Sequence, residues 1–254
     1  MNNNEIKDRL SKNPFTYTKG ILIETTNRCN YGILHPKCPA NKENIPRTLE
    51  LNNIIKIFKE LGKYEFDRII YPFCYSEPLI DPRFFKIVEL AHQYIPKAKV
   101  WIYTNGFMVD EILLKELDTL GVNKICFSAY TEKESIRIRK MILKNRDTLN
   151  VVLRAYKRFP MDEKMNDKIE WYDMIEPLNL KKKCSAPLSY LTIKADGEVI
   201  MCCHDWKQTH VLGSIKESTL SDIITNDKTV DMSQDLSEGK RCNYFLCARC
   251  NKKR

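Results

Sequence analysis

Strand-like runs alternate with helical segments over roughly the first 160 residues of this 254-residue chain, and this alternation restricts the fold more than any other feature. Strands are expected at 20–26, 68–73, 99–103, 124–128 and 150–156, and helices at 51–62, 81–94, 110–120 and 135–144. Such alternation joins parallel strands by right-handed crossovers. Five or six strand–helix units are too few to close an eight-stranded barrel, so we expect an α/β fold with an open, partial (β/α)6 TIM-like barrel.

Two short signals mark helix ends within this region. Asp81 is a suitable N-cap for the second expected helix, with Pro82 in its first turn. Gly121 is placed to end the third helix. Both signals agree with the boundaries that the alternating pattern predicts.

The pattern changes after Lys183. Strand-like runs at 188–194 and 198–202 flank the turn sequence Ala195-Asp196-Gly197, which predicts a β-hairpin. A helical segment and a cysteine cluster follow the hairpin. We therefore expect an N-terminal extension (1–18), a partial barrel (19–180) and a small C-terminal module with a hairpin and a helix (181–254).

The cysteines favour metal or cluster binding over disulfides. The chain has 10 of them, and half lie together near its C-terminal end, at Cys202, Cys203, Cys242, Cys247 and Cys250. The sequence has no apolar run of roughly 18 residues, and its first twelve residues are polar. We therefore expect a cytoplasmic protein with no membrane partner.

The net charge of +9 allows two interpretations. Basic runs at 181–183 and 252–254 are typical of a solvated face and an exposed tail. A positive surface also attracts anionic substrates or nucleic acid. Because the sequence contains no nucleic-acid-binding motif, nucleic acid is not an expected partner.

Candidate functional residues follow the expected strands at their carboxyl ends. In a barrel of parallel strands these ends share one face, where active sites form. Cys29 and Cys38 follow the first strand, Cys74 and Glu77 the second, Asn105 the third and Ser128 the fourth; His35 and Ser76 lie in the same loops. We expect these side chains to converge.

Four sequence segments resemble those of the radical S-adenosylmethionine (radical SAM) enzymes: Glu-Thr-Thr-Asn-Arg-Cys-Asn at 24–30, Ser-Glu-Pro-Leu at 76–79, Tyr-Thr-Asn-Gly at 103–106, and the C-terminal cysteines. The resemblance covers nearly the whole chain. It implies a [4Fe–4S] cluster in the first loop, with one iron open to the amino and carboxylate groups of SAM. Glu77 would contact the SAM amino group and Asn105 its ribose or methionine part, with Ser76 and Ser128 as further SAM-binding residues.

The first loop departs from the family's Cys-x3-Cys-x2-Cys pattern. Aligning Cys38 with the third family cysteine places His35 at the second position, so the ligands would be Cys29, His35 and Cys38. Imidazole replaces thiolate in some iron–sulfur sites and raises the potential, which would make reductive cleavage of SAM harder. Two alternatives stay open: Cys74 supplies the third thiolate, or the cluster is lost.

The C-terminal cysteines resemble the ligands of an auxiliary [4Fe–4S] cluster in a twitch domain, the shortened form of the SPASM domain. The implied ligands are Cys184, Cys202, Cys247 and Cys250, and either Cys203 or Cys242 could substitute for one of them. A structural zinc site also uses Cys-x2-Cys spacing and is the competing interpretation.

The resemblance implies a radical SAM oxidoreductase, similar to small dehydrogenases of aminoglycoside biosynthesis. A 5′-deoxyadenosyl radical would abstract hydrogen from a small sugar-like or peptide substrate. The auxiliary cluster would take the second electron, and an external flavodoxin- or ferredoxin-like protein would supply electrons. Arg154 on the fifth strand is a candidate to bind or deprotonate the substrate.

Two other functions remain open. A radical SAM epimerase or peptide-modifying enzyme is the first, with Cys126 as a candidate hydrogen donor. The second is a non-catalytic iron–sulfur or zinc protein with a degenerate first site.

Overall fold

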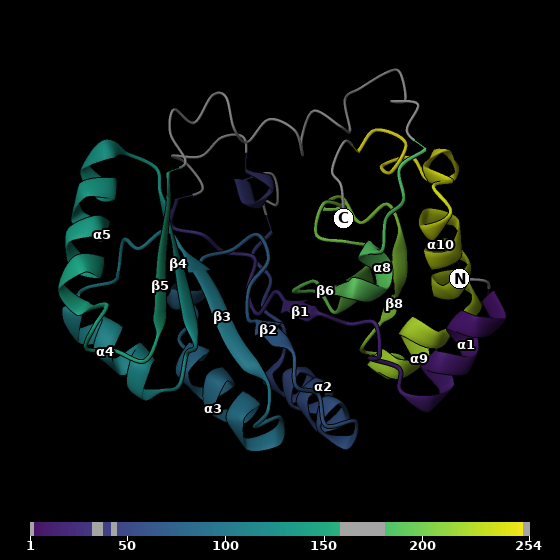
Figure 1. Ribbon diagram of the computed structural model, residues 1–254, viewed down its shortest axis with the longest axis horizontal. Coiled ribbons are helices and arrows are strands. Elements are labelled where there is room, and N and C mark those ends of the chain that lie inside the picture. The colour runs from purple at the N-terminus through teal and green to yellow at the C-terminus, as the bar shows by residue number, and fades with distance from the viewer. Residues whose placement is uncertain (1–2, 32–37, 42–44, 158–180, 251–254) are drawn as a thin grey trace.

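A single eight-stranded sheet organises the computed structural model, which describes residues 3–31, 38–41, 45–157 and 181–250. The strand order is β5-β4-β3-β2-β1-β6-β7-β8 (Figure 1). The strands are β1 (Gly20–Ile23), β2 (Ile69–Tyr71), β3 (Lys99–Thr104), β4 (Lys124–Ala129), β5 (Val152–Lys157), β6 (Tyr190–Ile193), β7 (Glu198–Ile200) and β8 (Val211–Ser214).

Six neighbouring strands, from β5 across to β6, run parallel, and β7 and β8 continue the sheet in antiparallel fashion. Within the described residues β5 and β8 each pair on one side only, so the sheet is open. This arrangement confirms the partial barrel. The strand β6 was expected only as an arm of the C-terminal hairpin, yet it also pairs with β1, with Gly20 opposite Tyr190.

The helices cover the sheet in two groups (Figure 1). Helices α2 to α5 alternate with β1 to β5 along the chain, and α1, α9 and α10 gather beside β8 at the other end. The bounds are α1 (Asn3–Lys12), α2 (Leu51–Lys63), α3 (Phe84–Tyr94), α4 (Glu111–Thr119), α5 (Glu132–Asn145), α8 (Ala186–Ser189), α9 (Leu220–Thr225) and α10 (Asp227–Ser237). Short 3₁₀ helices occur at Pro39–Asn41, Pro78–Ile80 and Arg241–Asn243.

Helix α2 shows why the periodic segments fold as expected. Its apolar side chains recur at helical spacing and are buried at Ile54, Ile57, Phe58 and Leu61. This stripe faces the core, and α2 packs against α3. The helical interpretation of residues 51–62 is therefore confirmed.

Helix α3 begins later than its sequence signal indicates. Asp81 is not its N-cap, because the helix starts at Phe84. The Asp81 carboxylate instead accepts hydrogen bonds from the backbone and guanidinium of Arg83, the latter at 2.7 Å. The same guanidinium donates to the carbonyls of Leu49 and Thr25, at 2.7 and 3.0 Å. Arg83 thereby fixes both ends of the long loop that follows β1.

The stop signal at Gly121 is confirmed. This glycine has a φ of +88°, in the left-handed region that ends helices. At the other end of α4, the Asp110 carboxylate accepts a 2.8 Å hydrogen bond from the backbone of Leu113 and caps the helix.

The first helix packs against the C-terminal part of the chain. Ile6 and Leu10 of α1 are buried, and α1 contacts α9 and α10. Lys7 also forms an exposed ion pair with Asp227 at 2.6 Å. In the part of the chain that the structure describes, none of the helices has the length and apolar character needed to cross a membrane.

Candidate active site

Glu77 is a buried carboxyl group at the centre of the loops that follow β1, β2 and β3. Its side chain is 2% exposed. It accepts hydrogen bonds from the Thr104 hydroxyl and the Asn105 backbone, both at 2.7 Å, and from the Leu79 backbone at 3.3 Å. Burial raises its pKa to about 7, against the opposing effect of these donors. A buried carboxyl group with a raised pKa is suited to bind a cation such as an ammonium group, because the cation stabilises the ionised carboxylate.

The first loop reaches the same place. The backbone of Glu77 donates to the Arg28 carbonyl at 3.0 Å, and the Asn105 side chain donates to Asn30 at 2.7 Å. Burial raises the pKa of the Cys29 thiol to about 11, and the nearby Glu77 and Cys38 add to this effect. The structure therefore brings together Cys29, Cys38, Glu77 and Asn105, as the carboxyl ends of parallel strands require.

Two further candidates, His35 and Ser76, are placed less completely. His35 falls in 32–37, outside the described residues, so the third ligand of the first cluster stays a prediction. The hydroxyl oxygen of Ser76 is buried and has no hydrogen-bond partner among the described residues. A buried hydroxyl in this condition, next to Glu77, fits a site that is completed by a polar ligand such as SAM.

A buried ion pair that sequence reasoning missed joins β1 to β6. Glu24 and Lys194 are 0% and 1% exposed, and their charged groups lie 2.8 Å apart. The Glu24 carboxylate also accepts from the backbones of Tyr75 and Ala195, at 3.1 and 3.2 Å. The pair thus connects the ends of β1 and β6 with the loop after β2. Finding it from sequence requires knowing that β6 lies beside β1, which no local pattern indicates.

A cavity of about 600 Å³ lies on the inner side of the sheet, next to these loops. We call it the active-site cavity. Its walls are rich in aromatic rings, with thiols at Cys74 and Cys203. The aromatic residues are Tyr71, Phe73, Tyr75, Tyr103 and Tyr190. Its size falls within the usual range for small-molecule sites.

Cys126 and Arg154 are partners on neighbouring strands, in register across β4 and β5. Cys126 is 0% exposed, and its thiol hydrogen-bonds with the hydroxyls of Tyr103 and Tyr156. It does not line the active-site cavity, whereas Tyr103 does. Arg154 is exposed. Ser128 is buried and lies two residues beyond Cys126, on the same face of β4.

Three of the predicted C-terminal ligands, Cys184, Cys247 and Cys250, lie near one another, and Cys202 follows Met201, whose sulfur contacts the Cys247 thiol. Cys202 and Cys247 are buried, and Cys184 and Cys250 are half-buried. Burial raises the pKa of the Cys247 thiol, and the proximity of Cys184 and Cys250 raises it further. Thiolates in such surroundings need a positive partner, and soft thiolate donors suit an iron–sulfur cluster.

The other two cysteines in this region have different surroundings. Cys203 lines the active-site cavity, and its carbonyl accepts a hydrogen bond from the Tyr75 hydroxyl. Cys242 is exposed. Among the described residues, no group of three or more His, Cys, Asp or Glu side chains has the geometry of a single-ion site.

Arg241 is a second residue that sequence reasoning did not identify. It is fully buried, and its guanidinium donates to the carbonyls of Lys182, Lys183 and Cys250, at 2.7, 3.2 and 2.8 Å. Its charge also lowers the pKa of Cys247. Arg241 therefore fixes the backbone on both sides of the cysteine group, next to Cys184 and at Cys250.

Comparison with known proteins identifies the family. Residues 23–160 match the radical SAM superfamily, and residues 184–251 match the SPASM iron–sulfur cluster-binding domain. The chain therefore belongs to the radical SAM superfamily and is a radical SAM enzyme, which confirms the resemblance seen in its sequence.

Individual relatives span almost the whole chain. The S-adenosyl-L-methionine-dependent 2-deoxy-scyllo-inosamine dehydrogenase of Niallia circulans is 28% identical over 237 residues, 91% of this chain and 92% of the relative. The structure of BtrN in complex with AdoMet and 2-DOIA is 25% identical, with a TM-score of 0.76 over 92% of this chain and 93% of that one. That of anSMEcpe with bound AdoMet is similar in fold, with a TM-score of 0.58 and 15% identity over 91% of this chain and 88% of that one.

Replacing Glu77 with glutamine should weaken SAM binding by about tenfold or more, because a hydrogen bond between charged groups is lost. For the unaltered protein, SAM affinity should rise as the pH increases from about 6 to 8, because Glu77 must lose its proton to pair with an ammonium group. Anaerobic calorimetry of the reconstituted protein measures both effects. A pH profile that Glu77→Gln leaves unchanged would contradict this assignment.

Replacing Lys194 with methionine should lower the free energy of unfolding by about 3–5 kcal/mol, because it leaves the buried Glu24 carboxylate without its cation. The double variant Glu24→Gln with Lys194→Met should recover much of this loss. Urea unfolding of the three proteins measures the difference. Equal stability of the single and double variants would exclude a coupled pair.

Replacing Arg241 with methionine should reduce the iron bound by the C-terminal cysteines, since it removes the donors that hold the backbone at Cys184 and Cys250. The matched control is Arg249→Met, because Arg249 bonds the carbonyl of the exposed Phe245. Iron-to-protein ratios after reconstitution, together with urea midpoints of the iron-free proteins, separate loading from folding. Full loading of Arg241→Met would show that Arg241 does not organise the site.

Proposed function

We propose that this chain is a radical SAM dehydrogenase that oxidises a small, sugar-like substrate by two electrons. The observation that carries the proposal is the position of the active-site cavity between the two cysteine-containing regions. Cys74, three residues before Glu77, lines it on one side, and Cys203, next to Cys202, lines it on the other. A substrate held there would contact both regions.

The proposal assigns ligands to two iron–sulfur clusters. Cys29, His35 and Cys38 would hold the SAM-binding cluster, and Cys184, Cys202, Cys247 and Cys250 the auxiliary one. With its cofactors bound, such an enzyme uses a 5′-deoxyadenosyl radical to remove a hydrogen atom from the substrate and an auxiliary cluster to accept the second electron.

The chain's own residues bind and orient the reactants. Glu77 would hold the amino group of SAM, with Ser76, Asn105 and Ser128 around the rest of the molecule. The aromatic walls of the cavity would exclude water from the radical. Arg154 lies across from Cys126 on β5, is exposed and does not line the active-site cavity, so it would bind or help deprotonate only a substrate group that extends beyond that cavity.

The substrate class rests on the size of the cavity and on the relative. A cavity of about 600 Å³ suits a small ring, and 2-deoxy-scyllo-inosamine, in the name of the Niallia circulans enzyme, is such a compound. The burial of Cys126 behind Tyr103 favours a dehydrogenase over an epimerase, because a hydrogen donor must reach the substrate. We further propose a cytoplasmic location and a flavodoxin- or ferredoxin-like electron donor.

The experiment is anaerobic reconstitution with iron and sulfide, followed by SAM and dithionite. We expect 5′-deoxyadenosine, quantified by mass spectrometry. His35→Ala should abolish its formation and lower the iron content, whereas Cys74→Ala should retain both. If Cys74→Ala alone abolishes it, Cys74 is the third ligand. If no variant and no condition yields 5′-deoxyadenosine despite a full auxiliary cluster, the chain is a binding protein with a degenerate first site.

A further inference from the structure

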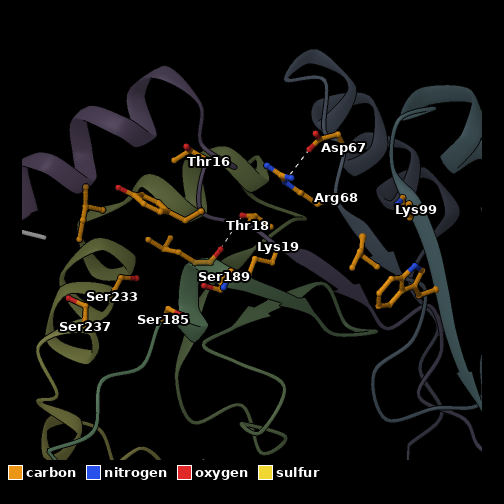
Figure 2. A pocket seen from close by; sticks show the side chains of 15 residues that line it. Thr16, Thr18, Lys19, Asp67, Arg68, Lys99, Ser185, Ser189, Ser233 and Ser237 are labelled. Carbon is orange, nitrogen blue, oxygen red and sulfur yellow. Dashed lines mark hydrogen bonds and ion pairs between the residues drawn. The ribbon is translucent and has the colours of Figure 1, made fainter. Parts of the chain in front are cut away.

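A second cavity, of about 670 Å³, lies at the opposite edge of the sheet, where β1, β2 and β3 begin (Figure 2). We call it the base cavity. Lys19 precedes β1, Asp67 and Arg68 precede β2, and Lys99 opens β3. On the other side lie Ser185 and Ser189, at the two ends of α8, and Ser233 and Ser237 of α10; Figure 2 shows Ser189 beside Lys19, and Ser233 and Ser237 farther away. None of these residues belongs to the radical SAM motifs.

The charges around the base cavity are unequal. Three cations, Lys19, Arg68 and Lys99, line it together with one acid, Asp67. Asp67 pairs with Arg68 at 3.1 Å. Neither lysine forms an ion pair within the described residues. The cavity thus keeps two positive charges without an ion-pair partner among the described residues, on the exposed side chains of Lys19 before β1 and Lys99 at the start of β3.

Serine and threonine hydroxyl groups line the same cavity. Those of Ser185 and Ser189 make no hydrogen bond within the described residues, so they are available as donors. The hydroxyls of Thr18 and Ser233 donate to backbone carbonyls, at 3.1 and 2.6 Å. Lysine, arginine and serine side chains are the groups that most often contact phosphate oxygens. A phosphate dianion can engage several such groups at once, which a neutral sugar hydroxyl cannot match.

The base cavity adjoins the active-site cavity, because Lys19 and Ser185 line both. A ligand whose ring lies against the aromatic walls of the active-site cavity can therefore place an anionic substituent beside the Lys19 ammonium group. An anion site unrelated to the reaction would have no need to adjoin the active-site cavity.

We propose that the base cavity binds the phosphate group of the substrate, so that the enzyme oxidises a phosphorylated sugar-like ring. This inference rests on the proposed function and narrows its substrate class. The cavity then fixes the orientation of the ring by its phosphate, with the ring turned into the active-site cavity.

The test measures binding of inorganic phosphate, of hexose and hexosamine 6-phosphates, and of their unphosphorylated parents to the anaerobically reconstituted enzyme by calorimetry. At least one sugar phosphate should bind more tightly than both inorganic phosphate and its parent sugar. Lys19→Gln and Lys99→Gln should each weaken its binding by about two- to fivefold, the range expected for one exposed charge pair. The matched control is Lys97→Gln, because Lys97 is exposed nearby, pairs with Glu65 and does not line the cavity.

The inference is overturned if no phosphate compound binds, if the parent sugars bind as tightly as their phosphates, or if Lys97→Gln weakens binding as much as the cavity variants. Binding of inorganic phosphate alone, with no gain from the sugar, would show an anion site separate from the substrate site and also reject it. Formation of 5′-deoxyadenosine without substrate is measured independently. A failure here therefore leaves the radical SAM activity intact and is distinguishable from failure of the proposed function.

Discussion

The buried ion pair between Glu24 and Lys194 is the contact on which the arrangement of both cysteine regions depends. Removing two charges from water is costly, and the cost is offset only where geometry and additional hydrogen bonds are favourable. Here the carboxylate receives the lysine and two backbone donors, from Tyr75 and Ala195. Together with Glu24 itself, these partners come from three separate segments, so the pair holds β1, β6 and the loop after β2 in one register.

This register brings two residues close in sequence to the candidate ligands, Cys74 and Cys203, to the wall of one cavity. Beyond Glu24 the chain enters the loop that carries Cys29, and beyond Lys194 it passes through the hairpin to Cys202. Tyr75 links the two regions, because its backbone bonds Glu24 and its hydroxyl bonds the Cys203 carbonyl. An enzyme that removes a hydrogen atom at one site and an electron at another needs such fixed geometry, since small displacements of the reacting groups greatly lower the reaction rate.

Much of the fold and part of the site follow from local sequence patterns. The apolar stripe of α2 and the glycine that ends α4 can be predicted from the sequence, because both depend on residues close together along the chain. The convergence of Cys29, Glu77 and Asn105 is also predictable, because the carboxyl ends of parallel strands share an edge. The pairing of β6 with β1 is not, since it joins residues about 170 positions apart. Lys194 was missed for that reason, and Arg241 because two of its acceptors, the carbonyls of Lys182 and Lys183, lie 59 and 58 positions away along the chain. Helix α3 starts late because Asp81 bonds Arg83 instead of capping the helix.

The central claim is that two distinct iron–sulfur clusters face one cavity and that only the first binds SAM. Mössbauer and electron paramagnetic resonance spectra of the ⁵⁷Fe-reconstituted protein, recorded with and without SAM, test it most directly. The account predicts two [4Fe–4S] clusters, about eight irons per chain, with SAM changing the signal of one and leaving the other unaltered. A single cluster, or two clusters that are both indifferent to SAM, would contradict it.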